Sequence, residues 1–352
     1  MARVNIIHVA NIELDCTTGM GRVAWEWRSA ALRRNFGFVH VGSNEVSKSF
    51  HYSLFALEAR RIIKKFLSSN SVLLIHEPWT WAFCDFPIAK VGFSHGLESR
   101  CFKIMQGAFN VSLRNRLFQP LWTSLSLSGL ARMDLILLIN TEDRDFFLSR
   151  RASVEVKVFR NGINARIDGL ADPENSTIIF NASWLDRKGK DLLVKSAVRL
   201  ADRGYKLRWL LIGTGKSCDE VRSDWPSELH GNLCIVPSFP AAEEHRYLIS
   251  AGIFVLPSYF EGSPLSLLQA MRVGLCCIAS DCCGQKDVIR HGFNGLLFEP
   301  GNEIELSRMI ERAVVDRALR RELSSNAIST VAGRTWEKVA DEVMDWIEEK
   351  VS

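Results

Sequence analysis

The sequence predicts an α/β protein built from two doubly wound domains with parallel sheets. Its 352 residues suit two domains of ordinary size, and 47% of them are apolar, which is enough for two cores. Short continuous apolar runs alternate with amphipathic stretches along the whole chain. This alternation is typical of parallel strands that are covered by helices on both faces.

The predicted elements follow this alternation in chain order. Strands are expected at Asn5–Val9, Gly37–Val41, Val72–Ile75, Val91–Ser94, Leu135–Ile139, Glu155–Phe159, Thr177–Phe180, Leu207–Ile212, Leu233–Val236, Ile253–Leu256 and Cys276–Ala279. The clearest helical patterns are Val23–Arg34, Leu54–Leu67, Asp191–Asp202, Glu243–Ser250 and Leu265–Arg272.

The boundary between the domains is expected near Asn161-Gly162, a dipeptide that favours a turn. This gives Rossmann-like domains at 1–160 and 161–335, with a final helix at 336–350 that packs back near the first domain. Ligands of doubly wound domains bind outside the carboxyl ends of the strands. Two such domains that face each other would hold a substrate in the cleft between them.

Charge is distributed unevenly along the chain. Residues 1–160 carry 21 Lys/Arg and 13 Asp/Glu, a balance of +8, and the remainder carries 23 and 27, a balance of −4. The basic half suggests an anionic partner, but not nucleic acid. The sequence shows neither a secretory signal nor an apolar run near the ~18 residues of a membrane span. We therefore expect a cytoplasmic protein, with the inner face of the plasma membrane as an alternative place.

Nine cysteines, an odd number, indicate free thiols in a reducing compartment. The pairs Cys276-Cys277 and Cys282-Cys283 suggest a metal site, but neighbouring residues of a strand point to opposite faces. Apolar packing beside a strand end is the favoured interpretation, and we expect no metal.

The most informative motif is Pro257-Ser258-Tyr259-Phe260-Glu261-Gly262-Ser263-Pro264-Leu265, which follows a strand and opens a helix. Pro264 suits the first helical turn. A helix start presents free N–H groups and partial positive charge to an anion such as phosphate. Glu261 would stand at the edge of the cleft, within reach of sugar hydroxyls. The alternative is a surface glutamate before an ordinary helix.

This motif, with Leu268-Gln269-Ala270-Met271, resembles the signature of glycosyltransferase family 4. So do Cys283-Gly284-Gln285-Lys286-Asp287-Val288-Ile289, Gly292-Phe293-Asn294-Gly295-Leu296-Leu297 and Thr335-Trp336-Glu337. The resemblance covers nearly the whole chain and is stronger in the second half. It implies the GT-B fold and a retaining, metal-independent transfer of a sugar from a nucleoside diphosphate.

The sequence departs from the family at Gln269. Family members usually have two glutamates eight positions apart, the first at the donor sugar and the second on the nucleotide ribose. Glu261 matches the first, and Gln269 stands at the second. A neutral acceptor makes a weaker hydrogen bond than a carboxylate, so nucleotide affinity would fall about tenfold without being abolished.

A second motif, Ser183-Trp184-Leu185-Asp186-Arg187-Lys188-Gly189, places two cations in a loop after a strand. Such cations suit a diphosphate, whose charge rises as the sugar–phosphate bond breaks. The resemblance implies that Lys188 contacts the phosphates, and our hypothesis is that Arg187 supplies a second cation. The alternative is a solvated helix start, although cations there oppose the helix dipole.

The first domain contributes two further candidates. Gly19 and Gly21 lie between the first strand and the first helix, where glycines permit close backbone approach to a ligand. They resemble the first glycine loop of the family, which lies across the cleft from the donor diphosphate. His95, in Ser94-His95-Gly96-Leu97-Glu98, resembles the family's histidine near the donor sugar, although an isolated histidine is often structural.

The segment 100–132 is basic and free of acidic residues, with apolar residues interleaved. Such a segment can lie on an anionic bilayer. Alternatively, its apolar residues belong to the core and its cations to a solvated face. Its cations are Arg100, Lys103, Arg114, Arg116 and Arg132.

Two other patterns carry less weight. Asp143-Arg144-Asp145 has the form of a metal-binding pair, but it lies early in a predicted helix, where acids favour the dipole. Gly213-Thr214-Gly215 follows a strand without the third glycine and the placed acid of a nicotinamide site.

Together these features predict a retaining hexosyltransferase without a cofactor, acting on a glycan or lipid-linked acceptor in polysaccharide biosynthesis. Lys188, Arg187 and the helix start at Gly262–Leu265 would hold the diphosphate, and Glu261 and His95 the sugar. Two alternatives remain open: a nucleotide-sugar epimerase or hydrolase on the same fold, and a catalytically silent nucleotide-sugar scaffold. The donor's base and sugar, the acceptor and the oligomeric state are not encoded in these motifs.

Overall fold

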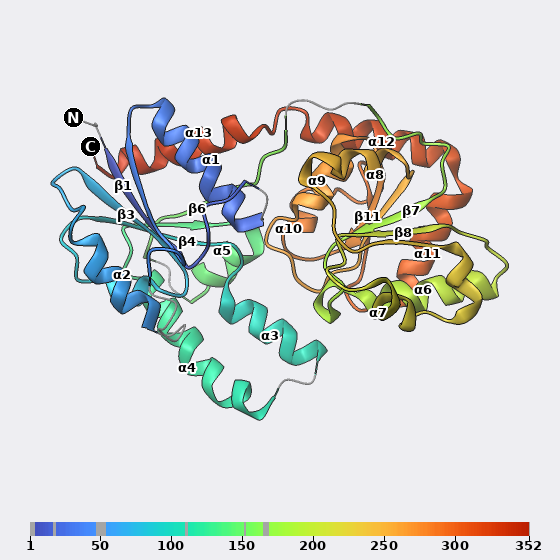
Figure 1. Ribbon diagram of the computed structural model, residues 1–352, viewed down its shortest axis with the longest axis horizontal. Helices are drawn as coiled ribbons and strands as arrows, with labels where there is room; N and C mark the ends of the chain where they lie inside the picture. Colours follow the sequence, from blue (N-terminus) through green and yellow to red (C-terminus); the bar gives the residue numbers. More distant parts are fainter. Residues whose placement is uncertain are drawn as a thin grey trace. The chain divides into compact units, whose positions relative to one another are not determined.

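The structure is a computed structural model that describes residues 4–16, 19–46, 54–109, 112–150, 153–164 and 169–351, apart from the side chain of residue 114. The chain forms two compact units (Figure 1). The first combines Met1–Gly162 with Trp336–Ser352, and the second is Ile163–Thr335.

The first unit contains a parallel sheet of six strands in the order β2-β1-β3-β4-β5-β6. Its strands are β1 (Asn5–Val9), β2 (Gly37–Val41), β3 (Ser71–His76), β4 (Ala89–Ser94), β5 (Leu135–Leu138) and β6 (Val156–Val158). Its helices are α1 (Gly19–Arg33), α2 (Phe55–Ile63), α3 (Glu98–Ala108), α4 (Leu113–Leu130), α5 (Thr141–Leu148) and α13 (Trp336–Glu349).

Alternate side chains of this sheet face different helices. Ile7 and Val9 of β1 pack into a core with α2 and the end of α4, whereas His8 points the other way, toward Trp27 of α1. The last helix, α13, lies beside α1 (Figure 1). Arg34, directly after α1, forms ion pairs with acidic residues of α13, and this contact attaches the end of the chain to the first unit.

The second unit contains a parallel sheet in the order β12-β11-β10-β7-β8-β9. Its strands are β7 (Ile178–Asn181), β8 (Trp209–Ile212), β9 (Leu233–Val236), β10 (Ile253–Leu256), β11 (Cys276–Ser280) and β12 (Leu296–Phe298). Its helices are α6 (Lys190–Asp202), α7 (Cys218–Ser223), α8 (Glu244–Ile249), α9 (Leu265–Arg272), α10 (Cys283–Lys286), α11 (Glu303–Val315) and α12 (Arg317–Val331). Helices α6, α7 and α11 cover one face, and α8 and α9 cover the other (Figure 1).

The predicted fold class is confirmed: both units are doubly wound and Rossmann-like, with parallel sheets and flanking helices. Several bounds differ from the sequence prediction; for example, β8 begins at Trp209 rather than Leu207. The short strand β12 was not predicted, α1 begins at Gly19 rather than Val23, and α2 ends at Ile63 rather than Leu67. The cleft between the domains stays a prediction.

Candidate active site

The second unit brings two predicted side chains together where its sheet order reverses. Along the chain, β8 and β9 are added on one side of β7, and β10 to β12 on the other. In such a sheet the loops after the two central strands run to opposite faces. A crevice therefore forms between them at the carboxyl ends of the strands. Lys188 follows β7 and Glu261 follows β10. Their side chains form an ion pair there, with 2.6 Å between Lys188 Nζ and Glu261 Oε1.

The Glu261 carboxylate is held by a second hydrogen bond. Glu261 is 7% exposed, and the Ser258 hydroxyl donates to the same oxygen, Oε1, at 2.7 Å. An ammonium carries three N–H donors. Within the described residues, Glu261 engages one of those of Lys188. Lys188 can therefore bind an anionic ligand while it stays paired.

A glycine allows the lysine loop to reach the end of β10. Gly189 has φ +75°, and a Cβ at this position would lie 2.0 Å from the Pro257 carbonyl oxygen. The Tyr259 N–H donates to the Arg187 carbonyl at 2.9 Å, so the two loops are joined through their backbones. This contact explains why Lys188 is followed by glycine.

Arg187 lies in the loop of Lys188, and Gln269 lies in the helix that follows the loop of Glu261. Arg187 belongs to the 3₁₀ turn Asp186–Lys188, and its side chain is half-buried. Gln269 is half-buried in the middle of α9. Their roles as phosphate and ribose contacts stay predictions.

The residues between Glu261 and α9 form a tight connection. Pro264 is the residue before the helix, with φ −70° and ψ 113°, and Leu265 is the first helical residue. Pro264 was predicted within the first turn, so its place is corrected by one position. Gly262 and Ser263 are half-buried.

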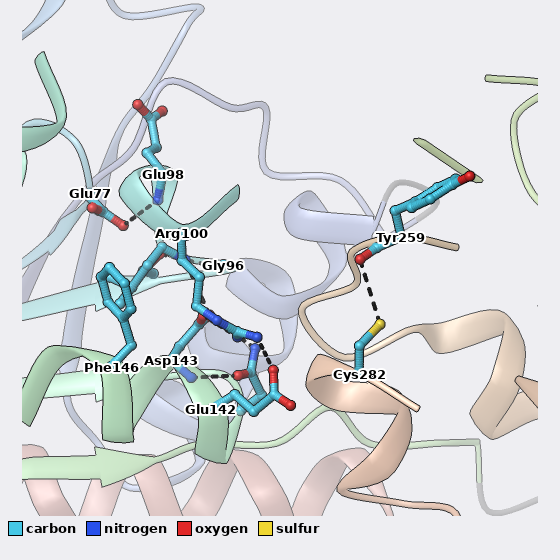
Figure 2. Close-up of polar contacts among 12 residues, drawn as sticks. Glu77, Gly96, Glu98, Arg100, Glu142, Asp143, Phe146, Tyr259 and Cys282 are labelled. Atoms are coloured by element: carbon cyan, nitrogen blue, oxygen red, sulfur yellow. Dashed lines mark hydrogen bonds and ion pairs between the residues drawn. The ribbon is translucent and has the colours of Figure 1, made fainter. Parts of the chain in front are cut away.

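The loop that carries Glu261 is braced from the start of α10 by residues of the motif around Cys283, to which sequence analysis assigned no structural role. The Gly284 N–H donates to the Glu261 carbonyl at 3.1 Å, and a Cβ on Gly284 would lie 1.9 Å from the Gly262 carbonyl oxygen. The buried Gln285 amide donates to the Leu256 carbonyl at 3.0 Å. The Cys282 thiol lies 3.5 Å from the Tyr259 carbonyl (Figure 2). The motif around Cys283 therefore supports the loop.

The cysteine pairs are packed in the interior. Cys276 and Cys277 are fully buried in β11, on opposite faces of the sheet. Burial raises the pKa of Cys276 to about 12 and that of Cys277 well above its usual value. Among the described residues, no group of three His, Cys, Asp or Glu side chains has the geometry to hold a metal ion.

The first unit places His95 directly after β4, beside the end of β3. Its ring centroid lies 5.4 Å from that of His76, a residue that sequence analysis did not single out. Burial lowers the pKa of His95 to about 4, so its imidazole is neutral at neutral pH. A neutral imidazole offers one N–H donor and one acceptor to a ligand.

The acidic residue Asp143 supports the turn after His95. It lies in the first turn of α5, as predicted, and its own N–H donates to the Asn140 side chain. Its fully buried carboxylate accepts from the Leu97 N–H at 3.1 Å and from Arg100 at 2.9 Å. Arg100 also pairs with Glu142 (Figure 2). A local network thus engages these acids.

The predicted glycine loop is corrected by the structure. Gly19 and Gly21 lie in the first turn of α1, not in a loop ahead of it. Gly21 is buried, whereas Gly19 faces open space. Thr17 and Thr18, which precede them, lie outside the described residues.

The basic segment 100–132 forms α3 and α4, which extend away from the sheet of the first unit (Figure 1). The end of α4 packs on that sheet, but its first half is exposed, with Pro120 inside the helix. Apolar side chains three or four positions apart form an exposed stripe there. They are Leu113 (73% exposed), Leu117 (63%), Phe118 (66%), Leu121 (72%) and Leu125 (40%). In the part of the chain that is described, no helix is long and apolar enough to span a bilayer.

The second unit is similar to glycosyltransferase sequences. Residues 164–330 match the family model described as Glycosyl transferases group 1. A Campylobacter jejuni N,N'-diacetylbacillosaminyl-diphospho-undecaprenol alpha-1,3-N-acetylgalactosaminyltransferase is 40% identical over 150 residues, which are 43% of this chain and 38% of that protein. A Clostridium botulinum glycogen synthase is 32% identical over 193 residues, 51% of this chain and 39% of that protein. The chain spans less than half the length of the curated relatives it matches.

Solved structures share the fold of the whole chain. A sucrose-phosphate synthase from Thermosynechococcus elongatus superposes with a TM-score of 0.79 over 98% of both chains, at 15% identity. The Anabaena protein HepE, solved in complex with UDP, has a TM-score of 0.73 over 98% of this chain and 100% of that chain, at 13% identity. At such identities the likeness shows the two-domain Rossmann-like fold alone.

Proposed function

We propose that this protein is a retaining glycosyltransferase that moves a hexose-type sugar from a nucleoside diphosphate to a hydroxyl of a glycan or lipid-linked acceptor. The observation that carries the proposal is the Lys188–Glu261 pair at the sheet reversal of the second unit. A cation for phosphate and a carboxylate for sugar hydroxyls stand 2.6 Å apart there. The glycosyltransferase match over the same unit supports this interpretation.

The proposed chemistry requires charge stabilisation without a metal. As the sugar–phosphate bond breaks, negative charge grows on the leaving diphosphate. Lys188 and Arg187 would stabilise this charge, together with the N–H groups at the start of α9. Lys188 is held in place by Glu261, so little reorganisation accompanies the step.

The sugar and the acceptor complete the proposed reaction. Glu261 and the neutral His95 would contact the sugar, and Gln269 the ribose. The acceptor hydroxyl would attack the face that the phosphate leaves, and the departing phosphate oxygen would take its proton. Retention, the hexose and independence from metal are parts of the proposal that follow from the family resemblance.

Thermal unfolding with UDP, GDP, ADP, dTDP and CDP in EDTA tests the donor site. One diphosphate is expected to raise the Tm of the wild type but not that of Lys188→Ala. Lys190→Ala is the matched control, since Lys190 bonds to Asp224 at 3.1 Å and to Asp186 at 3.4 Å. If no diphosphate stabilised the wild type at millimolar concentration, the donor site would be rejected and the scaffold alternative favoured.

Product analysis separates the remaining alternatives. Turnover with a competent acceptor excludes a silent scaffold. An isomerised nucleotide sugar without acceptor would favour an epimerase, and free sugar would favour a hydrolase. Because solved neighbours include complexes with UDP and with UDP-glucose, UDP-glucose is the first donor to test.

We further propose that the segment 100–132 contacts an anionic membrane through α4. The apolar stripe of α4 is exposed, and no acidic residue lies between 99 and 133. Lys103, Arg116 and Arg132 are exposed, and no ion pair within the described residues neutralises them. A second copy of the chain would bring like charges together, whereas anionic headgroups would neutralise them. The lipid surface is therefore the partner to which we commit.

Vesicle co-sedimentation tests this contact. The wild type is expected to bind phosphatidylglycerol-containing vesicles but not pure phosphatidylcholine. Joint replacement Leu117→Gln and Leu121→Gln is expected to weaken binding roughly tenfold or more, because two apolar side chains leave the bilayer. Arg114→Glu with Arg116→Glu tests the charge, and Leu32→Gln, on an exposed leucine of α1, is the control. If the wild type does not bind anionic vesicles, the membrane contact is rejected. If the protein is a dimer that Leu117→Gln dissociates, the partner of α4 is a second copy of the chain.

A further inference from the structure

The first unit buries a carboxyl group without a cation beside it. Glu77 directly follows β3, is 1% exposed, and has no ion pair with a Lys or Arg side chain among the described residues. Its oxygens accept from three neutral donors instead. These are the Ser126 hydroxyl at 2.5 Å and the Ser94 hydroxyl. The third is the Glu98 N–H at 3.4 Å (Figure 2). Burying a carboxylate costs free energy of desolvation unless hydrogen bonds compensate. The three donors provide this compensation for Glu77.

Two of these donors stand on either side of His95. Ser94 is the residue before it, and Glu98 follows three residues later. The Ser94 oxygen also accepts from the Gly96 N–H at 3.2 Å. Gly96 has φ +141°, which turns the chain from β4 into α3. Glu77 thus holds the turn 94–98 at both ends.

The third donor connects this turn to α4. Ser126 is fully buried, and Trp122, one turn earlier, donates from Nε1 to Glu98 Oε2 at 2.9 Å. Gly129 brings the same helix against the backbone after Pro78, since a Cβ there would lie 2.3 Å from the Trp81 nitrogen. Two carboxyl groups, Glu77 and Glu98, therefore attach the turn to the packed end of α4.

We propose that Glu77 is the positioning residue for His95: its carboxylate fixes the turn 94–98 and so sets the imidazole for contact with the transferred group. The inference rests on the proposed function, in which His95 contacts the donor. Glu77 acts through His95 and does not itself touch the substrate.

The charge state of Glu77 supplies a signature of this role. Burial raises the pKa of Glu77 to about 7, and the nearby Glu98 adds to the effect. A proton on this carboxyl occupies one of its lone pairs and removes its negative charge, which weakens the hydrogen bonds from the three donors. Burial also raises the pKa of Glu98, and it lowers the pKa values of His76 and His95. With the pKa of His95 at about 4, a change in kcat near pH 7 would report Glu77 and not the histidine.

A double-mutant cycle on kcat tests the positioning role. Glu77→Gln is expected to lower kcat roughly tenfold or more, with KM for the donor nearly unchanged, because misplacement weakens transition-state contacts. In the His95→Ala background the same substitution is expected to have almost no effect, since the group it positions is gone. Equal losses in both backgrounds would overturn the proposal and leave Glu77 a structural residue.

The pH profile gives a second readout. The kcat of the wild type is expected to decrease as the pH falls below about 7. The kcat of Glu77→Gln is expected to lack this decrease. Glu77→Asp, which retains a carboxylate, is expected to recover part of kcat at high pH. A decrease that persists in Glu77→Gln would contradict the assignment.

Amide hydrogen exchange separates this inference from the proposed function. Exchange of residues 96–100 is expected to quicken about tenfold in Glu77→Gln, as for the loss of one hydrogen bond. Glu13→Gln, on an exposed glutamate of the same unit, is the control, and melting curves verify that both variants fold. If the exchange of residues 96–100 is unchanged in Glu77→Gln, Glu77 does not fix the turn 94–98, whatever the activity. A wild type without transfer activity would reject the proposed function. The exchange result would still show whether Glu77 fixes the turn 94–98.

Discussion

The first and second units both gather polar residues near the reversal of their sheet order, and the two sets differ in charge. In the second unit, Lys188 and Glu261 form an ion pair between the loops after β7 and β10. In the first unit, the corresponding residues around β1, β3 and β4 are histidines and a buried carboxyl. Burial lowers the pKa values of His8 and His76 well below the usual value of histidine.

The histidines of the first unit are arranged as neutral rings. His40 Nε2 lies 3.0 Å from the Ile12 carbonyl, so this nitrogen donates. In a neutral ring the other nitrogen then accepts, and it lies 2.8 Å from His8 Nδ1, which donates to it. His8 Nε2 is left as a buried acceptor without a partner among the described residues. A proton there would create a buried imidazolium.

The comparison assigns different tasks to the two units. A cation that stays paired with a carboxylate is held in position and still has N–H donors for an anion. The neutral histidine rings and the buried carboxyl of the first unit supply shape and hydrogen bonds. Because burial shifts their pKa values, the free energy of unfolding depends on pH. Substitutions in the second unit should therefore reveal geometry and charge, and those in the first unit should reveal protonation.

The largest effect is expected for Gly189→Ala. Its φ of +75° is unfavourable for alanine, and the new Cβ would overlap the Pro257 carbonyl oxygen at 2.0 Å. We expect a loss of about 3 kcal/mol or more in the free energy of unfolding, measured by urea titration. Gly215→Ala is the matched control, because φ is +64° but no atom lies within 4 Å of the new Cβ. Equal losses at both glycines would show that close packing of the lysine loop on β10 contributes nothing.

The next largest effect separates recognition of diphosphate from sugar transfer. Glu261→Gln keeps an acceptor for the Ser258 hydroxyl and removes the charge that Lys188 pairs with. Diphosphate affinity is expected to stay the same or improve, while transfer falls by roughly 10- to 100-fold, about 1.5–3 kcal/mol for a charged hydrogen bond. Calorimetry and product assays would measure the two quantities, with Glu228→Gln as an exposed control. Loss of diphosphate binding would mean that Glu261 mainly orients Lys188.

Local sequence patterns predicted much of the fold and the members of the Lys188–Glu261 pair. The strand Ile253–Leu256 and the helix Leu265–Arg272 have the predicted bounds, because an apolar run and a proline-led helix are local signals. The motifs around Lys188 and Glu261 likewise indicated a phosphate and sugar site. Their contact depends on β7 and β10 being neighbours, which spacing in the sequence does not specify.

Other features have partners too distant in the chain to be read from local patterns. In the first unit, the hydrogen bond from Ser126 to Glu77 joins residues 49 positions apart. In the sequence, Glu77 looks like the polar end of an apolar strand. The strand β12 has only three residues, too few to show a period. The glycines before Val23 were predicted to form a loop that approaches a ligand, but they lie in the first turn of α1, where tertiary packing outweighs the low helix propensity of glycine.

The smallest effect concerns two neighbours, His76 and Glu77, which should change acid stability in opposite directions. Burial lowers the pKa of the folded His76 well below 6.5, so below about pH 6.5 only the unfolded residue binds a proton, and its contribution to stability is lost as pH falls. The folded Glu77, with its pKa raised to about 7, binds a proton that the unfolded residue has lost, so its contribution falls as pH rises.

Each substitution should therefore alter the slope of unfolding free energy against pH by up to about 1.4 kcal/mol per pH unit, the value for one proton. His76→Phe is expected to flatten the rise in stability between about pH 4.5 and 6.5, and Glu77→Gln to steepen it. Urea unfolding at several pH values measures both slopes, and Glu13→Gln controls for the loss of an exposed carboxylate. Slopes that move in the same direction would contradict the assignment of a neutral histidine beside a proton-binding carboxyl. Opposite changes would place the pH response of this protein in the first unit.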